Sequence, residues 1–250
     1  MDKRTLSYIN LYAILGSIPT LCQVDKEAKE IIAHQNISVG FEVKNGPAGT
    51  LRFKDGKCSF SQGAEDCMIK LPFSSPEKFN GMIEGTVTPI PSKGFTKIGF
   101  LLHDFMKLTD ILQKYLRPAP GALEEEQFLD ASTRVMFSLI VAAVCAVGNE
   151  DKIGRSSASY MTDGVVKLEI GGGPVAYIQV KNHTLSIVKN ELDSYSSYMR
   201  FENMHTAREL FDGRVNAVVC VGLGKVRVGG MISQVDNLNR IMDRVSAYLA

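Results

Sequence analysis

The sequence contains no tryptophan and only five cysteines in 250 residues. The cysteines are odd in number and widely spaced, and no two of them form a CxxC pair. These features argue against a zinc knuckle or a disulfide framework and indicate a reducing compartment. We therefore expect a cytoplasmic protein without a bound metal.

Neither sign of charge is in excess, since Lys and Arg number 28 and Asp and Glu number 27. A net charge of +1 provides no basic footprint for nucleic-acid binding. No block of like charges is present, which argues against a disordered interaction tail. The composition, 45% hydrophobic and 22% charged, is ordinary for a globular protein, and the length predicts one or two domains.

The sequence also lacks an apolar run long enough for a membrane span. The longest run, residues 135–147, reads VMFSLIVAAVCAV and is 13 residues long, whereas a span needs about 20. We expect this run to form a buried core helix. Residues 6–21 could be read as a signal peptide, but Asn10, Gly16 and Pro19 interrupt them. Their helical periodicity favours a packed helix, so we expect no transmembrane segment.

Recognised catalytic motifs are missing, because the sequence has no GxSxG, P-loop, HExxH or complete GxGxxG motif. The four histidines lack metal-ligand spacing, and Cys67 and Cys220 are expected on strands as small hydrophobes. We therefore predict a protein that is not an enzyme, with no catalytic residue, no metal and no cofactor. Four basic residues are interpreted as solvated surface, with an anionic headgroup as the alternative: Arg200, Arg208, Arg214 and Lys225.

The first half is predicted to contain helices over residues 2–35, with Asp25 as an N-cap, and strands from Ile37 onward. Asn45-Gly46-Pro47 and Asp55-Gly56 are turn signals. Further elements are then expected: a strand over Cys67–Leu71, a helix from Ser75 to Gly85, a strand over Lys97–Leu102, and an amphipathic helix that includes Phe105, Leu108, Leu112 and Tyr115.

The second half begins with a helix over residues 121–150 and then returns to strands. The expected elements are strands over Tyr160–Ile170, Val175–Val180 and Thr184–Lys189, a helix over Phe201–Phe211, a strand over Lys225–Val228, and a last helix whose apolar stripe is Leu238, Ile241, Met242, Val245 and Leu249. The stripe has the spacing of a helix that buries one face.

The same order of elements thus occurs twice. Residues 73–97 align without gaps with residues 201–225, with five identities over 25 positions and a shift of 128. The hairpin turns Asp55-Gly56 and Asn182-His183 fall at nearly the same shift. We predict four segments: N-terminal helices over 1–35, a first α+β module over 36–117, a connecting helix over 118–153, and a second module of the same topology over 154–250.

Two segments resemble the sterol carrier protein type 2 family. Gly49–Gly85 reads GTLRFKDGKCSFSQGAEDCMIKLPFSSPEKFNGMIEG, and Met199–Gly230 reads MRFENMHTARELFDGRVNAVVCVGLGKVRVGG. The resemblance implies two tandem α+β modules, each an antiparallel or mixed sheet with helices on one face, joined by a buried helix. It also implies an apolar tunnel that binds fatty acids, acyl-CoA, sterols or phospholipids. The length, the N-terminal helices and the tandem arrangement depart from the family pattern.

We therefore predict non-catalytic binding or carrying of an apolar ligand, such as a fatty acid, acyl-CoA or other lipid, in a cavity of the second module. Prolines at 89 and 91 are expected to alter the sheet edge of the first module. The alternative is a structural or assembly protein with filled cores that binds a protein partner or forms a homodimer. The predicted ligand-binding residues are Phe201, Met204, Leu210, Phe211, Val226, Val228, Leu238, Ile241, Met242 and Val245.

Overall fold

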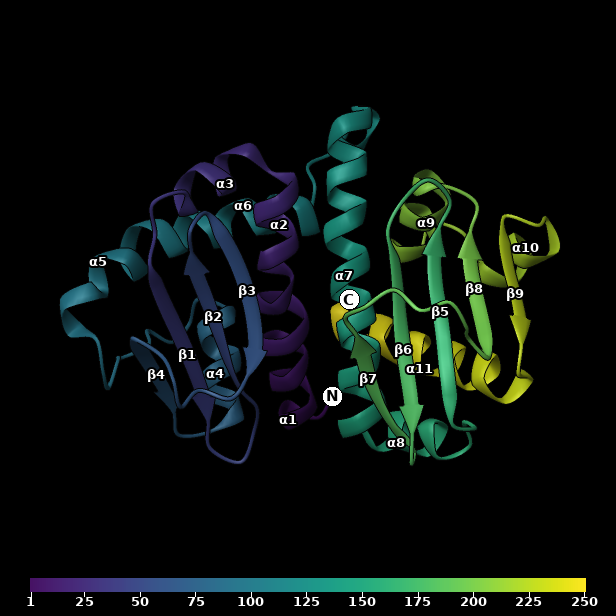
Figure 1. The fold of residues 1–250 in the computed structure, drawn as a ribbon, viewed down its shortest axis with the longest axis horizontal. Helices are drawn as coiled ribbons and strands as arrows, with labels where there is room; N and C mark the ends of the chain where they lie inside the picture. Colours follow the sequence, from purple (N-terminus) through teal and green to yellow (C-terminus); the bar gives the residue numbers. More distant parts are fainter. The chain divides into compact units, whose positions relative to one another are not determined.

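The computed structural model describes all 250 residues. They form two compact units, Met1–Ala122 and Leu123–Ala250, each with its own sheet and helices (Figure 1). The expected α+β class is confirmed. The first unit includes the segment predicted as separate N-terminal helices. The segment predicted as a connecting helix, 118–153, is divided, with residues 118–122 in the first unit and the rest in the second.

The first unit begins with helices, as predicted for residues 2–35. Lys3 to Val24 is one helical stretch, and Asp25 caps the next helix by accepting a hydrogen bond from the Ala28 N–H. The elements are α1 (Lys3–Tyr8), η1 (Ile9–Ile14), η2 (Leu15–Ser17), α2 (Ile18–Val24) and α3 (Lys26–Ile32).

A four-stranded sheet follows, in the order β3-β2-β1-β4, with β4 parallel to β1 and the other pairs antiparallel. The strands are β1 (Ile37–Val43), β2 (Ala48–Lys54), β3 (Lys57–Gln62) and β4 (Ile69–Phe73). Asp55 and Gly56 have φ of 52° and 70°, the paired positive values of a type I′ turn, so the predicted hairpin is confirmed.

Residues 97–102, expected as a strand, are helical instead. The remaining elements of the unit are α4 (Pro76–Ile83), η3 (Phe95–Lys97), α5 (Ile98–Phe100), η4 (Leu101–Phe105) and α6 (Met106–Leu116). Ser75 caps α4 as expected, and the predicted apolar stripe is buried, with Phe105 on η4 and Leu108, Leu112 and Tyr115 on α6.

Proline explains why the first sheet has no fifth strand. Lys70 on β4 makes one antiparallel bridge with Lys93. Continuing that ladder by two residues would place Pro72 opposite Pro91, and neither residue has an N–H to donate. The sheet edge therefore differs from that of the second unit, where Arg200 pairs with Arg227.

The second unit contains a five-stranded sheet in the order β7-β6-β5-β8-β9. A short helix, η5 (Ala122–Glu124), leads into it. Its elements are α7 (Glu126–Glu150), α8 (Lys152–Ser159), β5 (Gly164–Ile170), β6 (Val175–Lys181), β7 (Thr184–Val188), β8 (Ser197–Phe201), α9 (Met204–Phe211), α10 (Ala217–Gly222), β9 (Val226–Gly230) and α11 (Ile232–Leu249).

The apolar run at 135–147 lies inside α7 and is buried over most of its length, as predicted. Within the second unit, α7 packs against α8, α9, α11 and β7. The helix is longer than the run itself, since it extends from Glu126 to Glu150. The burial of α7 on several sides explains why residues 135–147 are nearly all apolar, because such a helix has no water-facing side on which polar residues are favoured.

Three elements of the second unit differ from the sequence prediction. The expected strand over residues 160–170 begins only at Gly164, because residues 160–163 form the turn between α8 and β5. Residues 197–201 form β8, so Phe201 lies on a strand and not on the helix expected over residues 201–211. Residues 217–222 form α10, which places Cys220 on a helix and not on a strand. Short segments such as these are decided by their tertiary partners more than by local preference.

The first four strands of each sheet share order, direction and register. Val39 on β1 pairs with Leu51 and Ile69, and Val166 on β5 pairs with Ile178 and Ser197. Asn182-His183 also adopts the paired positive φ, at 49° and 62°. Because β9 has no strand counterpart in the first unit, a shared topology over the full predicted segments stays a prediction.

Candidate ligand-binding site

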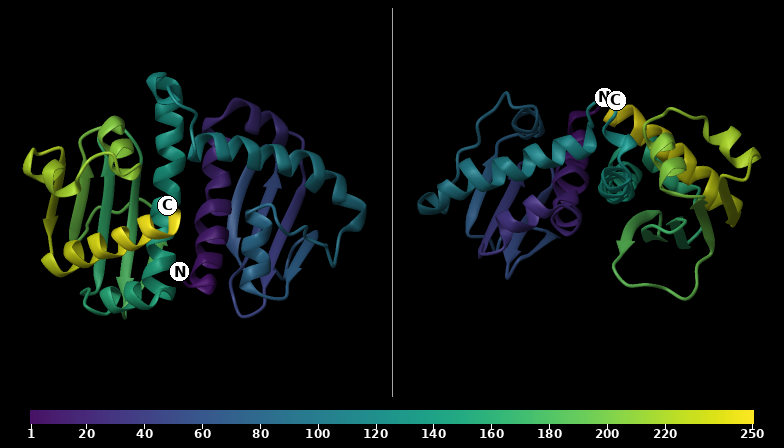
Figure 2. Two further views of the ribbon diagram at one scale, coloured as in Figure 1. Left: turned by 180° about the vertical axis from the view of Figure 1, so that it is seen from behind. Right: turned by 90° about the horizontal axis from the view of Figure 1, so that it is seen from above.

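The core face of the second sheet carries large apolar residues on β8 and β9. Phe201 pairs with Val226, and Met199 pairs with Val228, so these four side chains lie on one face. The helices of the unit lie on one side of the sheet (Figure 2). Of these, α9 and α11 both contact β8, but they make few contacts with each other. The sheet face is therefore covered by two helices that do not pack closely together.

Helix α9 is positioned at both ends by local interactions. The Asn203 side chain accepts a hydrogen bond of 2.9 Å from the Thr206 N–H, and Gly213 follows the helix with φ of 68°. This orientation places the Phe211 ring edge-on to Phe201, with centroids 5.4 Å apart. Sequence and packing thus direct the apolar side of α9 toward β8.

Helix α11 is anchored at its start by a buried polar group. Gln234 is fully buried, and its amide oxygen accepts hydrogen bonds from the hydroxyls of Ser196 (2.8 Å) and Ser197 (2.6 Å). Its amide nitrogen donates to the Thr162 carbonyl at 2.8 Å. Because the buried amide is satisfied at both atoms, it holds the start of α11 against β8 without a desolvation penalty.

A second buried group holds the end of α11. Asp151 is 2% exposed and accepts hydrogen bonds from Arg244, from the Tyr248 hydroxyl at 2.8 Å, and from the N–H groups of Ile153 and Gly154. Burial alone would raise the pKa of this carboxyl, but the hydrogen bonds from Arg244, Gly154 and Tyr248 outweigh burial and lower its pKa. Asp151 is therefore an anionic cap of α8 that also fixes α11.

The ten predicted ligand-binding residues lie on β8, β9, α9 and α11. Phe201 is the one that sequence reasoning placed on the wrong element. Five are buried: Phe201, Val226, Leu238, Ile241 and Val245. Five are half-buried: Met204, Leu210, Phe211, Val228 and Met242.

Sequence reasoning did not identify Gln234 or Asp151, because their partners are distant in the chain. A signal for Asp151 was present, since an Asp directly before a helix is a typical N-cap. The interpretation of Arg208 as a solvated surface residue was wrong. Arg208 is 2% exposed, and it contacts Asp212 at 3.0 Å and the Ser132 hydroxyl of α7 at 2.6 Å. Its guanidinium joins α9 to α7.

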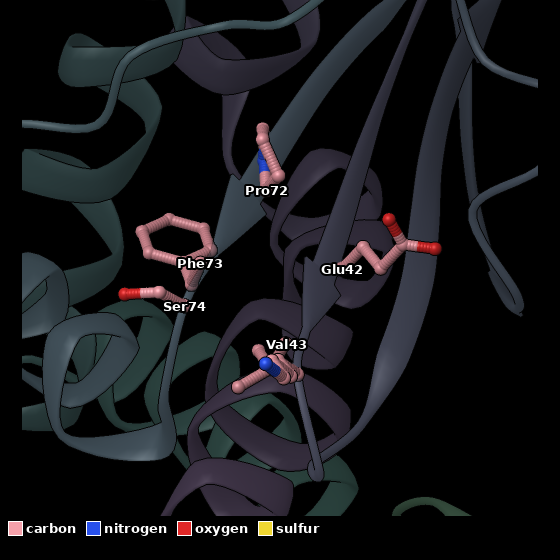
Figure 3. Close-up of a pocket in the computed structure, with 6 residues that line it drawn as sticks. Glu42, Val43, Pro72, Phe73 and Ser74 are labelled. Carbon is pink, nitrogen blue, oxygen red and sulfur yellow. The ribbon is translucent and has the colours of Figure 1, made fainter.

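A pocket is also present in the first unit, at the ends of β1 and β4 (Figure 3). It is open, has a volume of about 590 Å³, and is lined by Glu42, Val43, Lys44, Pro72, Phe73 and Ser74. In Figure 3 the Glu42 carboxylate and the Ser74 hydroxyl point in different directions. Glu42 also forms an ion pair with Lys70 at 3.0 Å. The polar groups do not converge on one point, as those of a ligand site usually do.

All five cysteines are free thiols, and no group of three or more His, Cys, Asp or Glu is arranged to hold a metal ion. A hydrogen bond with Cys22 raises the pKa of the Cys58 thiol, and burial raises it further. Burial raises the pKa of Cys145 to about 12. Both thiols are therefore poor nucleophiles at neutral pH.

We expect Cys58 and Cys145 to react slowly with iodoacetamide at pH 8 in the folded chain, because little thiolate is present. Mass spectrometry of the alkylated protein measures this directly, and the denatured protein, in which all five cysteines should react, is the control. Rapid alkylation of either residue in the native protein would contradict the assignment.

Two helical stretches, Lys3–Val24 and Glu126–Glu150, are long and apolar enough by length and composition to cross a membrane. They are 61% and 78% buried, and core helices pass the same test. The sequence-based expectation of packed helices is consistent with this burial.

No family model and no curated protein matches the chain. Solved structures do match. A ubiquinone synthesis protein described as UbiJ-SCP2 has 15% identity over 43% of this chain and 96% of its own, with a TM-score of 0.33. Sterol carrier protein domain 2 of Helicoverpa armigera has 11% identity, with coverages of 45% and 89% and a TM-score of 0.34. Sterol carrier protein 2 like 2 of Aedes aegypti has 14% identity, with coverages of 43% and 96% and a TM-score of 0.31. These matches are to structures of the sterol carrier protein type 2 family, the family that the sequence resembles.

Proposed function

We propose that this chain is a non-catalytic binder or carrier of an apolar ligand, such as a fatty acid, acyl-CoA or other lipid. The proposed site is the core face of the second unit, where α9 and α11 cover β8 and β9. The five free cysteines support the further proposal that the chain works in a reducing compartment such as the cytoplasm.

One observation carries this proposal. Five large apolar side chains at this face are only half-buried: Met204, Leu210, Phe211, Val228 and Met242. A filled core would bury such residues, since interiors pack closely. Two of the five are methionines, whose flexible side chains adapt to irregular apolar surfaces. This partial exposure supports a site at which a ligand would cover the remaining apolar surface of these side chains.

The expected affinity follows from the area that an acyl chain would bury. Burial of about 300 Å² at roughly 25 cal/mol per Å² corresponds to about 7 kcal/mol. That free energy, before the costs of association, corresponds to a Kd in the low micromolar range. The buried anchors Gln234 and Asp151 fix the start and the end of α11, so a ligand would not need to order this helix.

Replacing Met242 by tryptophan is expected to weaken fatty-acid binding at least tenfold, because the larger indole would fill the proposed site beside α11. Titration with a fluorescent fatty acid measures the Kd. Since the natural chain has no tryptophan, the emission of the introduced indole also reports whether its surroundings are apolar. Met106→Trp is the matched control, because Met106 is 54% exposed on α6 of the first unit.

Three results decide the proposal. Loss of binding in Met242→Trp with normal binding in Met106→Trp supports it. Unchanged binding in a folded Met242→Trp variant places the site elsewhere. If the natural chain binds no apolar ligand at micromolar concentration, and no lipid co-purifies with it in native mass spectrometry, the structural or assembly function, with a protein partner or a homodimer, becomes the better account.

A further inference from the structure

Exposed apolar side chains concentrate in two corresponding segments of the chain. We name residues 85–103 and 213–235 the post-helix segments, because each follows a helix that ends at a glycine with positive φ, Gly85 after α4 and Gly213 after α9. Eighteen large hydrophobic side chains are exposed, and ten of them lie in these segments. The exposure is therefore a regional feature and not a scatter of single residues.

The second post-helix segment holds most of this exposed surface, on α10 and at the start of α11. Its exposed residues are Val218 (79%), Val219 (57%), Val221 (43%), Leu223 (68%), Met231 (42%) and Ile232 (84%). In Figure 1, α10 lies beside the edge strand β9. The first post-helix segment exposes Ile90 (75%), Phe95 (61%), Ile98 (39%) and Leu102 (61%).

The charges of these segments are all of one sign. Neither segment contains Asp or Glu, although the chain has 27 in 250 residues and four or five would be expected in stretches of this total length. The second segment carries Arg214, Lys225 and Arg227, and the first carries Lys93 and Lys97. Lys225 and Arg227 are exposed. Arg214 is paired at 3.5 Å with Asp212, which lies just before the segment, so Lys225 and Arg227 are the exposed cations of the segment that form no ion pair. Exposed apolar side chains beside these two cations match the chemistry of an anionic lipid surface.

We propose that the second post-helix segment docks on an anionic lipid bilayer, with Val218, Leu223 and their neighbours entering the boundary between headgroups and acyl chains. Lys225 and Arg227 contact the headgroups. The first post-helix segment has the same chemistry and is the corresponding docking element of the first unit. This inference goes beyond ligand binding by the second unit and does not depend on it.

The backbone of α10 suits insertion, because its end groups are satisfied within the segment. The Asn216 side chain accepts hydrogen bonds from the N–H groups of Val218 and Val219 at 2.9 and 3.2 Å. At the other end, the N–H groups of Leu223 and Lys225 donate to carbonyls of α10. Apolar surface can therefore leave water without burying unpaired amides, which would be costly in lipid.

Charge also decides between a bilayer and a second copy of the chain. A symmetric dimer through α10 would bring the same surface of each copy together. Lys225 and Arg227 of one copy would then face the same basic residues of the other, with no acidic residue in the segment to pair with them. An anionic bilayer instead attracts all of these groups, each by about 1 kcal/mol.

Flotation of the full chain with lipid vesicles tests this proposal. The chain is expected to float with vesicles of phosphatidylcholine and phosphatidylglycerol and not with phosphatidylcholine alone. The variant Val218→Ser/Leu223→Ser combined with Phe95→Ser/Leu102→Ser should bind anionic vesicles at least tenfold more weakly, since four inserted side chains are removed. Lys225→Ser/Arg227→Ser should weaken binding by about tenfold or more at low salt, and raising the salt should weaken binding of the natural chain.

The matched control removes exposed apolar side chains elsewhere in the second unit. Ile153→Ser/Tyr160→Ser changes residues that are 55% and 69% exposed outside the post-helix segments, and it should float like the natural chain. Circular dichroism checks that every variant is folded. Because all the replaced apolar residues are exposed, the variants are expected to retain the fold.

Four outcomes would overturn the proposal: no flotation of the natural chain, equal binding to neutral vesicles, equal loss of binding in the control, or a concentration-dependent dimer that the serine variant abolishes without any vesicle binding. The assay contains no fatty acid, and Met242→Trp should float normally. A chain that floats but binds no fatty acid would therefore refute only the ligand site, and the reverse result would refute only the docking surface.

Discussion

Replacing Asp151 by alanine is expected to lower the free energy of unfolding of the second unit by about 3 kcal/mol. The change removes the cap of α8 and leaves the buried Tyr248 hydroxyl and the partly buried Arg244 guanidinium without their carboxylate partner. Denaturant unfolding measured by circular dichroism gives the free-energy difference. A loss below 1 kcal/mol would show that water replaces the carboxylate at little cost.

Asp130→Ala is the matched control within the same unit. Asp130 forms an ion pair with Arg134 one turn along α7, and its side chain is 46% exposed. Such exposed pairs contribute little because water and salt screen them, so the expected loss is below about 1 kcal/mol. The difference between the two losses of unfolding free energy measures the contribution of the hydrogen bonds around Asp151, because both variants remove a carboxylate.

The contribution of Asp151 is also expected to depend on pH. Because the pKa of Asp151 is lower in the folded chain than in the unfolded chain, its stabilisation is fully present above about pH 4 and is lost as pH falls through the lower folded value. The difference in unfolding free energy between the natural chain and Asp151→Ala should therefore shrink below pH 4. A difference that stays constant down to pH 2 would contradict the lowered pKa.

Replacing Phe41 by alanine is expected to lower the free energy of unfolding of the first unit by about 4 kcal/mol. Phe41 is fully buried on β1, and its ring lies 6.2 Å from that of Phe79 and 6.0 Å from that of Phe105. Alanine would leave a cavity and remove both aromatic contacts. Hydrogen exchange of the β1 amides measures this loss of stability within the first unit.

Phe95→Ala is the control for the same substitution at the surface. Phe95 is 61% exposed, so its truncation is expected to change stability by no more than about 0.5 kcal/mol. If both variants lose similar stability, the core of the first unit is less tightly packed around Phe41 than the ring contacts indicate.

Several elements were predictable from the sequence because local interactions decide them. Asp25 and Ser75 cap their helices with their own side chains. The Asp55-Gly56 hairpin depends on two residues that tolerate positive φ. The apolar periodicity of α11 indicated which face of that helix is buried, and the continuous apolar run in α7 indicated burial on several sides. Each signal lies within a few residues, so a single sequence contains it.

The candidate site was predictable only as a set of apolar residues. The spacing of Leu238, Ile241 and Val245 placed one face of α11 in the core. The pairing of β8 with β9 placed Phe201 on the sheet that α11 covers. The half-burial of Met242 depends on tertiary packing around α11, which no local pattern encodes.

By itself, the sequence determined the α+β class, the caps, the hairpins and the buried faces, because these follow from hydrogen bonds and hydrophobic periodicity within short stretches. Only the tertiary structure decided which sheet edges remain unpaired and which apolar surfaces remain exposed to solvent. Residues 97–102 became helical, the ladder that starts at Lys70 and Lys93 does not continue to Pro72 and Pro91, and the valines of α10 remained exposed beside β9. Strand pairing and burial depend on partners far away in the chain, so the same apolar residues can line a core, a ligand site or a docking surface.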